Sequence, residues 1–228
     1  MKNILITGCS RGLGAVIAKQ LLKQKQKGNV IPHFRKIGSY IDYGETPNAI
    51  LGDLNEKTTR EQITECLQEH DINVFINNAS VHKQDLLTDH SEEDIIKIIN
   101  TNLTSQILII RRVYDWFKKR GSGLVINVNS IAGLQPAPKE TIYSATKHGL
   151  KGFSQSLQVE SMNSDIKIVD IYPGAMMTDM TLSRKDYNQL IKPEEVSNII
   201  CDVVMNKNTT SLTTEIVIRK FISKGTVI

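Results

Sequence analysis

Short apolar runs alternate with longer amphipathic segments along nearly the whole chain. The runs are rich in β-branched residues and predict strands at 3–7, 29–34, 49–51, 72–77, 123–129, 166–172 and 213–220. Between them, apolar residues recur at helical spacing and predict helices at 13–24, 55–70, 91–120, 141–162 and 193–205. Strands that are apolar throughout and separated by helices are typical of a parallel sheet covered on both faces. The pattern therefore predicts an α/β, Rossmann-like, doubly wound fold with a mainly parallel seven-stranded sheet and right-handed crossovers.

Individual residues refine where these elements begin. Asn55 is a candidate N-cap for the helix that follows it. Ser91 opens a predicted helix whose acidic first turn and basic last turn suit the helix dipole. Pro193, followed by two glutamates, marks the start of another helix. Pro32 weakens the second predicted strand, because proline has no N–H for a ladder bond.

The composition is that of an ordinary globular protein. Of 228 residues, 40% are hydrophobic and 23% charged, and no repeat or linker divides the chain, so we expect one domain over 1–228. The net charge of +4 is mild and the basic residues are scattered over predicted helices, which does not favour a nucleic-acid partner. No apolar run approaches the roughly 18 residues of a membrane span.

Cysteine and histidine usage points away from disulfides and metals. The three cysteines lie far apart without a CxxC pair, which favours a reducing compartment. Since the N-terminus also lacks the pattern of a signal peptide, we expect a cytoplasmic protein. The five histidines have no ligand spacing and are interpreted as structural or surface residues, with His82 alone near a predicted cleft loop. No metal site is predicted.

A glycine-rich turn, TGCSRGLG at 7–14, joins the first predicted strand to the first predicted helix. Gly8, Gly12 and Gly14 would let the backbone turn tightly and approach a ligand closely. The amides at the start of the next helix would suit a pyrophosphate. The spacing differs from the common dinucleotide fingerprint, and the Gly-Lys-Ser/Thr of a P-loop is missing. A glycine-rich turn without a ligand is the alternative.

Four further motifs follow in order: NNAS at 77–80, SIAG at 130–133, YSATK at 143–147 and YPGAMMT at 172–178. Together with the glycine loop, they make the chain resemble the short-chain dehydrogenase/reductase (SDR) family over roughly residues 3–220. Each motif is weak alone, but five in this order and spacing are specific. The sequence departs from the family at Ser80, where the family has glycine. A positive φ there would strain serine by about 1 kcal/mol, and any other backbone would leave it harmless.

The resemblance implies a catalytic group of Asn102, Ser130, Tyr143 and Lys147. Tyr143 would be the general acid/base. A free phenol has a pKa of about 10, which a nearby cation lowers, and Lys147 lies one helical turn away. Lys147 would also bind the nicotinamide ribose, and Ser130 would stabilise charge on the substrate oxygen. Asn102 would bend its helix and hold a water near the lysine; a solvent-facing helix residue is the alternative.

The same resemblance assigns residues to a nicotinamide cofactor. The glycine loop would contact the phosphates, the residues after the third strand would flank adenine, NNAS would lie beside the adenosine ribose, and Thr178 would hold the carboxamide. The full expected set is Gly8, Ser10, Arg11, Gly12, Leu13, Gly14, Arg35, Asp53, Leu54, Asn78, Ala79, Tyr143, Lys147, Pro173, Gly174 and Thr178.

Charge at the end of the second predicted strand favours one form of the cofactor. NAD-preferring sites place an acid there, whereas a 2′-phosphate is bound by arginine. The strand ends in HFRK, without an acid, and Arg11 lies in the glycine loop. Arg11 and Arg35 would clamp the phosphate, so NADP(H) is predicted over NAD(H). A shift of one residue would put Lys36 in place of Arg35.

The implied function is that of an NADP(H)-dependent carbonyl reductase or alcohol dehydrogenase with a small-molecule substrate. A 3-oxoacyl-carrier-protein reductase is an alternative, although the final strand TTEIVIRK lacks the glycine-rich ending common in that branch. A catalytically silent NADP(H)-binding sensor is another, but it would not need all four catalytic residues. Helices 91–120 and 141–162 carry more apolar residues than one buried face requires, which favours a homodimer or homotetramer.

Overall fold

All seven predicted strands are present in the computed structural model, which describes residues 1–23, 28–36, 48–206 and 213–220. They form one sheet in the order β3-β2-β1-β4-β5-β6-β7, and every pairing is parallel. The strands are β1 (Ile4–Ile6), β2 (Val30–Phe34), β3 (Ile50–Leu51), β4 (Val74–Asn77), β5 (Ser122–Val128), β6 (Asp165–Pro173) and β7 (Glu215–Ile218). The α-helices are α1 (Gly12–Lys23), α2 (Lys57–Glu69), α3 (Glu92–Ile99), α4 (Ser105–Arg120), α5 (Thr141–Ser161) and α6 (Pro193–Met205). The predicted doubly wound α/β fold is confirmed.

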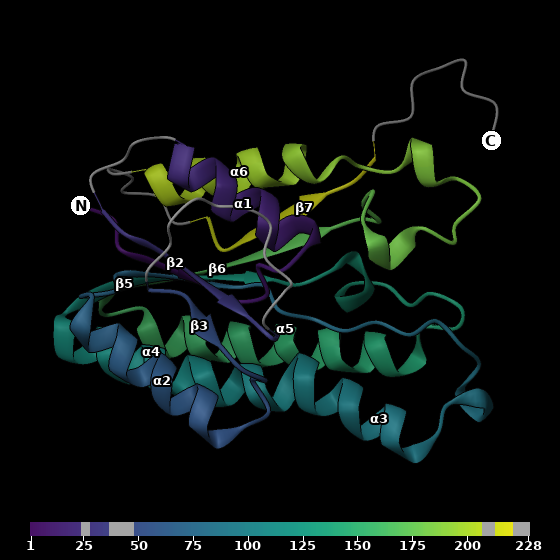
Figure 1. The fold of residues 1–228 in the computed structure, drawn as a ribbon, viewed down its shortest axis with the longest axis horizontal. Helices are drawn as coiled ribbons and strands as arrows, with labels where there is room; N and C mark the ends of the chain where they lie inside the picture. The colour runs from purple at the N-terminus through teal and green to yellow at the C-terminus, as the bar shows by residue number, and fades with distance from the viewer. Residues whose placement is uncertain (24–27, 37–47, 207–212, 221–228) are drawn as a thin grey trace.

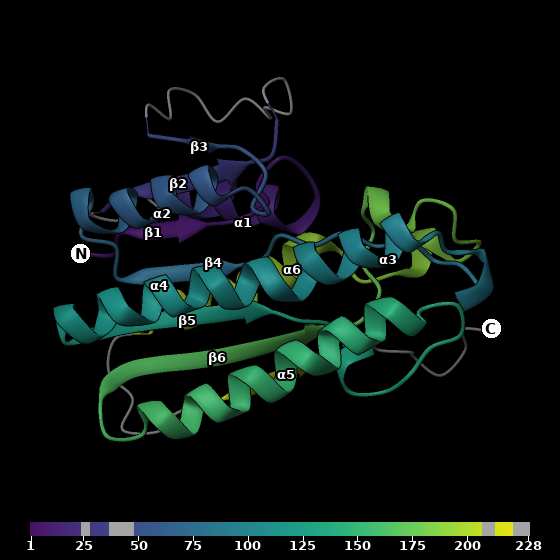
Figure 2. The same cartoon turned by 90° about the horizontal axis from the view of Figure 1, so that it is seen from below.

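Helices cover both faces of the sheet. Helices α1 and α6 lie on one face, and α2, α4 and α5 lie side by side on the other (Figures 1 and 2). Neighbouring strand residues point to opposite faces. Ile4 therefore joins the core under α1 and α6, while Leu5 joins the core under the other three helices. Burial on both faces explains why the strands read as continuous apolar runs.

Pro32 lies inside β2 and leaves the strand intact. The backbone carbonyls of Asn29 and His33 accept hydrogen bonds from the β1 side. Because backbone groups alternate sides along a strand, the nitrogen of Pro32 faces β3. β3 pairs only with His33 and Phe34, so its ladder begins one residue later and loses no bond to the proline.

Two of the three predicted helix starts are confirmed. Ser91 accepts a hydrogen bond from the backbone N–H of Asp94 at 3.2 Å, and Pro193 occupies the first turn of α6. The assignment of Asn55 as an N-cap is wrong, because α2 begins at Lys57 and its N-cap residue is Glu56. The Asn55 side chain donates instead to the Thr101 hydroxyl at 3.0 Å, a long-range contact that local sequence does not reveal.

The single helix predicted over 91–120 is interrupted. A π-helical segment, Asn100–Thr104, separates α3 from α4. Its wider turn places Asn102 in the interior, with no exposed surface. The interruption therefore falls on a predicted catalytic residue.

The strand order reverses between β1 and β4, and in α/β folds ligands bind where this happens, beyond the carboxyl ends of the strands. Helix α3 and the chain from 174 to 190 both extend past this edge, on opposite sides of the sheet (Figure 1). The topology therefore predicts a ligand-binding site at the loops after β1 and β4.

Candidate active site

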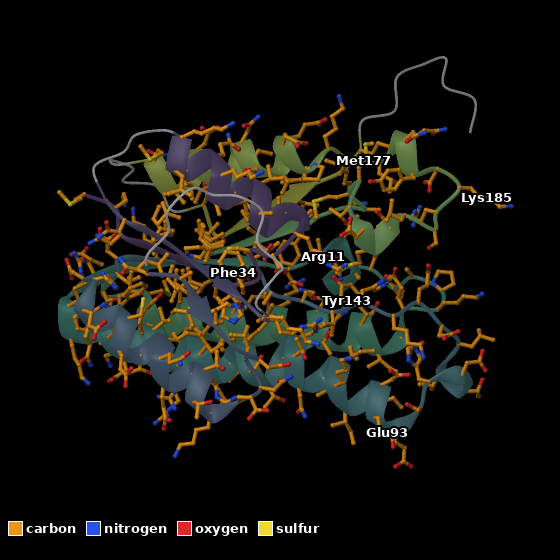
Figure 3. All side chains as sticks on the ribbon, in the orientation of Figure 1. Arg11, Phe34, Glu93, Tyr143, Met177 and Lys185 are labelled. Atoms are coloured by element: carbon orange, nitrogen blue, oxygen red, sulfur yellow. The ribbon has the colours of Figure 1, made fainter. Side chains whose placement is uncertain are left out.

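A cavity of about 490 Å³ opens at this edge of the sheet. It reaches from the glycine loop and the end of β2 to the start of α5, with Arg11 on the side of α1 and Tyr143 on the side of α5 (Figure 3). Fourteen of the sixteen predicted cofactor residues line it: Gly8, Ser10, Arg11, Gly12, Leu13, Gly14, Arg35, Asp53, Leu54, Asn78, Ala79, Tyr143, Lys147 and Thr178. The other two, Pro173 and Gly174, lie at the end of β6 beside Ile218 and are not among its lining residues.

The glycine loop forms a close-packed backbone cradle. Gly8 and Gly12 have φ values of 74° and 58°, a region that favours glycine. A Cβ on Gly14 would lie 2.3 Å from the Gly8 carbonyl oxygen, so only glycine lets α1 start this close to the loop. The Asn78 amide fixes the loop by donating to the carbonyls of Thr7 and Gly8, at 2.9 and 3.2 Å. Exposed amides at a helix start suit a phosphate, so these residues fit a dinucleotide.

Basic side chains stand at the end of the cavity near β2. Arg35 and Lys36 are exposed and both line the cavity. The Arg11 side chain is 69% exposed, and its Nη1 lies 3.4 Å from Oδ2 of Asp179 on the opposite rim. An exposed ion pair of this kind contributes little free energy, so Arg11 can exchange Asp179 for a ligand anion.

His33 also lines the cavity, a role that no pattern in the sequence indicates. The ring is buried, its Nδ1 accepts from the Gly8 N–H at 3.3 Å, and its Nε2 lies 2.9 Å from the Gly52 carbonyl oxygen. Because the carbonyl can only accept, the hydrogen is on Nε2 and the ring is neutral. Burial also lowers the pKa of His33, which favours this form. His33 thus holds the glycine loop against the end of β3.

The structure brings Ser130, Tyr143 and Lys147 together at the other end of the cavity. Tyr143 and Lys147 share one face of α5, and the lysine Nζ lies 5.6 Å from the centre of the tyrosine ring. Nζ donates to the Val128 carbonyl at the end of β5, at 3.2 Å. Ser130 follows the same strand, and its hydroxyl acts to lower the pKa of the Tyr143 phenol. A proton donor, a hydroxyl and a cation therefore meet at one point.

Burial sets the ionisation of this group. Tyr143 is 9% exposed, and burial raises its pKa to about 12, while hydrogen bonds from Ser130 and Ser80 act in the opposite direction. The charge of Glu140 adds to the increase. Lys147 is 1% exposed, and burial lowers its pKa to about 8, opposed by the charge of Asp170. Near neutral pH, Lys147 is still mainly a cation beside a neutral phenol.

Asn102 lies behind this group and holds the loop after β4. Its Oδ1 accepts from the Val81 N–H at 2.8 Å and from the Ser80 hydroxyl at 3.2 Å, and its Nδ2 donates to the Val81 carbonyl at 2.7 Å. The alternative of a solvent-facing residue is wrong, because the side chain is fully buried. The π-helical turn carries Asn102 into this contact.

His82, in the loop after β4, and Glu140, just before α5, flank Tyr143. The imidazole meets the phenol ring edge-on with 4.8 Å between centres. Its Nε2 lies 3.3 Å from Oε1 of Glu140, and both side chains are largely shielded from solvent. The ring contacts Tyr143 and limits its orientations, but His82 is not among the residues that line the cavity. The expectation that His82 alone of the histidines lies near the cleft is wrong, because His33 lines it.

The remaining lining residues were not in the predicted set, although Ser80 and Met176 belong to the NNAS and YPGAMMT motifs. Asn129 is the clearest case: its Oδ1 accepts from the Ser130 N–H at 2.9 Å and its Nδ2 donates to the Lys147 carbonyl at 3.2 Å. In the sequence, only the position of Asn129 next to the SIAG motif indicated that it lies at the site. The others beyond the predicted set are Ser80, Val81, Thr101, Val128, Met176, Asp179 and Met180, with His33 and Lys36 described above.

Among the residues that the structure describes, no group of three or more histidine, cysteine, aspartate or glutamate side chains could hold a metal ion. None of the helices in the described part of the chain has the length and apolar character needed to cross a membrane.

Known proteins are similar to this chain in sequence. A family model described as short chain dehydrogenase matches residues 2–189. The 3-oxoacyl-(acyl-carrier-protein) reductase of Chlamydia trachomatis is 34% identical over 202 residues, which cover 81% of this chain and 78% of that protein.

Solved structures agree on the fold. A 3-ketoacyl-(acyl-carrier-protein) reductase from Brucella melitensis complexed with NADH has a TM-score of 0.84 at 21% identity, covering 95% of this chain and 96% of the other. The closed form of a serine dehydrogenase complexed with NADP+ also has a TM-score of 0.84, at 24% identity, covering 99% and 98%.

Proposed function

This chain belongs to the short-chain dehydrogenase/reductase family and is an oxidoreductase of that family, and we propose that it is an NADP(H)-dependent carbonyl reductase or alcohol dehydrogenase. The observation that supports this most is the pairing of Tyr143 and Lys147 in the cavity that begins at the glycine loop, with Ser130 beside it after Asn129. A silent sensor would not need this group, so we favour an enzyme.

Tyr143, Ser130 and Lys147 have different roles in the proposed proton transfer. A nicotinamide cofactor, when bound, supplies or accepts the hydride. In the reducing direction, Tyr143 gives its phenolic proton to the carbonyl oxygen and Ser130 donates a hydrogen bond to the same oxygen. The Lys147 cation stabilises the phenolate that remains. In the oxidising direction the same groups act in reverse.

The assay that tests this proposal follows NADPH consumption against ketones, sugars and 3-oxoacyl thioesters. We expect turnover of at least one carbonyl class by the wild-type protein. A folded protein that binds NADPH and reduces no member of the panel would support the silent sensor instead.

3-Oxoacyl thioesters are the second candidate substrate class. They are favoured by the 34% identity to a relative named for this reaction, over 81% of the chain. One feature speaks against this class. The segment TTEIVIRK, which contains β7 (Glu215–Ile218), lacks the glycine-rich ending common in reductases of 3-oxoacyl-carrier protein. The thioester arm of the panel decides between this class and other carbonyls.

NADP(H) is the proposed cofactor because Arg11, Arg35 and Lys36 stand at one end of the cavity. We expect Arg35→Ala to weaken NADPH binding by about 10-fold to 100-fold, the effect of losing one hydrogen bond to a charged group. NADH affinity should change little, since it lacks the 2′-phosphate. Fluorescence titration with both cofactors measures this.

Lys36→Ala is the matched control for Arg35→Ala, because the two residues are adjacent, exposed and equally charged. An unchanged NADPH preference in Arg35→Ala would remove Arg35 from the phosphate site. A loss confined to Lys36→Ala would assign the contact to the lysine.

The proposal includes a homodimer or homotetramer in the cytoplasm. Apolar side chains are exposed on the outer helices: Ile96, Ile99, Leu108, Val159 and Met162. Burying them in an interface would remove this surface from water. Light scattering that reports a monomer would contradict the assembly. Cys9, Cys66 and Cys201 are buried thiols, which suits a reducing compartment.

A further inference from the structure

The imidazole of His82 packs against the ring of Tyr143 without lining the cavity itself. The two ring centres are 4.8 Å apart and the ring planes stand at 82°, an edge-to-face arrangement that aromatic pairs prefer. Tyr143 lines the cavity, and His82 does not. Any effect of His82 on the proposed reaction therefore acts through Tyr143.

The backbone next to His82 is fixed by Asn102. The Asn102 amide binds Val81 twice, because Oδ1 accepts from the Val81 N–H at 2.8 Å and Nδ2 donates to the Val81 carbonyl at 2.7 Å. Asn102 is itself fully buried in the π-helical segment. Since Val81 directly precedes His82, this buried amide sets where the imidazole starts from the chain.

Glu140 holds the other end of the imidazole, from the turn before α5. Its Oε1 lies 3.3 Å from Nε2 of His82, and the two side chains are only 18% and 12% exposed. A carboxylate can only accept, so His82 donates from Nε2. Glu140 occupies the N-cap position of α5, yet its side chain makes no hydrogen bond to the helix amides. The carboxylate thus serves His82 and not the helix end.

The turn before α5 has an unfavourable backbone conformation at Lys139, where φ is 61°. Among the described residues other than glycine, only Asp71 shares a positive φ, so Ser80 has no such strain. The Lys139 carbonyl accepts from the Asp85 N–H at 3.0 Å, which ties this turn to the loop that carries His82. Backbone strain persists only where the surrounding contacts hold it. The two segments are therefore joined through both backbone and side chains.

We propose that His82 is a positioning residue, which keeps the phenol of Tyr143 aimed into the cavity. Asn102 and Glu140 keep His82 itself in place. This inference rests on the proposed function. A phenol that turns away from the carbonyl oxygen cannot give it a proton, and a ring packed edge-on against the phenol limits that rotation.

His82→Ala should lower kcat for carbonyl reduction by about 3-fold to 10-fold, the effect of losing one aromatic contact. NADPH affinity should not change, because His82 does not line the cavity. His82→Phe retains a ring at this position and should recover most of the loss. Steady-state kinetics and NADPH titration on the same preparations measure both quantities, and thermal denaturation checks that each variant is folded.

A pair of variants measures the part played by Glu140. Glu140→Ala removes the acceptor that holds the imidazole, so kcat should fall as in His82→Ala. Glu140→Gln keeps an acceptor oxygen, and its kcat should exceed that of Glu140→Ala. In the His82→Phe background there is no donor for this oxygen, so the two Glu140 variants should have equal kcat there.

His148→Ala is the matched control, since His148 is an exposed histidine of α5 whose Nδ1 lies 2.9 Å from the Ser144 carbonyl oxygen. Its kcat should equal that of the wild type. A second readout needs no turnover: the ring-carbon resonances of Tyr143 in protein with isotope-labelled tyrosine, assigned by their loss in Tyr143→Phe. A neighbouring aromatic ring shifts these resonances, so they should move in His82→Ala and stay in place in His148→Ala.

The outcomes separate the two proposals. With an active wild type, unchanged kcat or unchanged Tyr143 resonances in His82→Ala would overturn the role of His82 and leave the proposed function standing. An equal loss of kcat in His148→Ala, or a parallel loss of NADPH affinity in His82→Ala, would also overturn it, because general damage to the fold would then explain the effect. A wild type that reduces no carbonyl would overturn the proposed function and, with it, the positioning role.

Discussion

Tyr143→Phe should lower kcat for carbonyl reduction by about 10³-fold, the usual contribution of a general acid. Phenylalanine keeps the ring, so the edge contact with His82 and the position beside the Lys147 ammonium remain. What disappears is the only group that we assign to give a proton to the substrate oxygen. NADPH affinity should be nearly unchanged, because no cofactor contact that we assign to Tyr143 needs its acidity.

Steady-state turnover and NADPH titration on the same preparation give the required comparison. Tyr114→Phe is a suitable control, since Tyr114 packs beside the core under α2, α4 and α5 and is absent from the cavity lining. Thermal denaturation of both variants checks that the fold is retained. Turnover retained by Tyr143→Phe would remove Tyr143 from the acid role.

Much of this fold was predictable because local pattern and global packing agree. The inner strands are largely buried on both faces, so continuous apolar runs mark them, whereas the edge strand β7 is partly exposed. Ser91 and Pro193 mark helix starts by chemistry that acts within one turn. The glycine loop was predictable because part of its geometry is local: Gly8 and Gly12 have positive φ, and Gly14 lies against the Gly8 carbonyl.

What could not be predicted depends on contacts between distant segments. Asn55 bonds Thr101 rather than capping its own helix, and Arg11 pairs with Asp179 across the cavity. The π-helical segment at Asn100–Thr104 has no periodicity signal, and only the family resemblance, which implies that Asn102 bends its helix, pointed to it. Ser80 could be identified as a departure from the family, but its partners could not.

A row of buried polar residues near Lys147 was also not predicted, because the strands that contain them are otherwise apolar. Asn77, Asn127 and Asp170 stand opposite one another in β4, β5 and β6. Asn127 donates to the Ser154 hydroxyl at 3.1 Å, which donates to Asp170 at 2.8 Å. Burial raises the pKa of Asp170 to about 6, so near neutral pH it is mainly a carboxylate. Its charge favours the protonated form of Lys147.

Lys147→Met should reduce kcat/KM by about 10²-fold or more and weaken NADPH binding at the same time, which distinguishes it from Tyr143→Phe. Methionine fills a similar buried volume but removes the charge that stabilises the phenolate and the donor assigned to the ribose. The pH profile of oxidation should also move to higher pH, since the phenolate loses its cation. Turnover assays and NADPH titration over a pH series measure all three effects.

Burial lowers the pKa of Lys147 to about 8, and this predicts how NADPH binding by the wild type depends on pH. As pH rises through this value the ammonium loses its proton, so NADPH affinity should fall above about pH 8. The affinity of Lys147→Met should show no such fall. Lys151→Met, one turn further along α5, removes a lysine outside the cavity lining and should behave as wild type. Equal pH dependence in wild type and Lys147→Met would show that the lysine charge has no part in holding the cofactor.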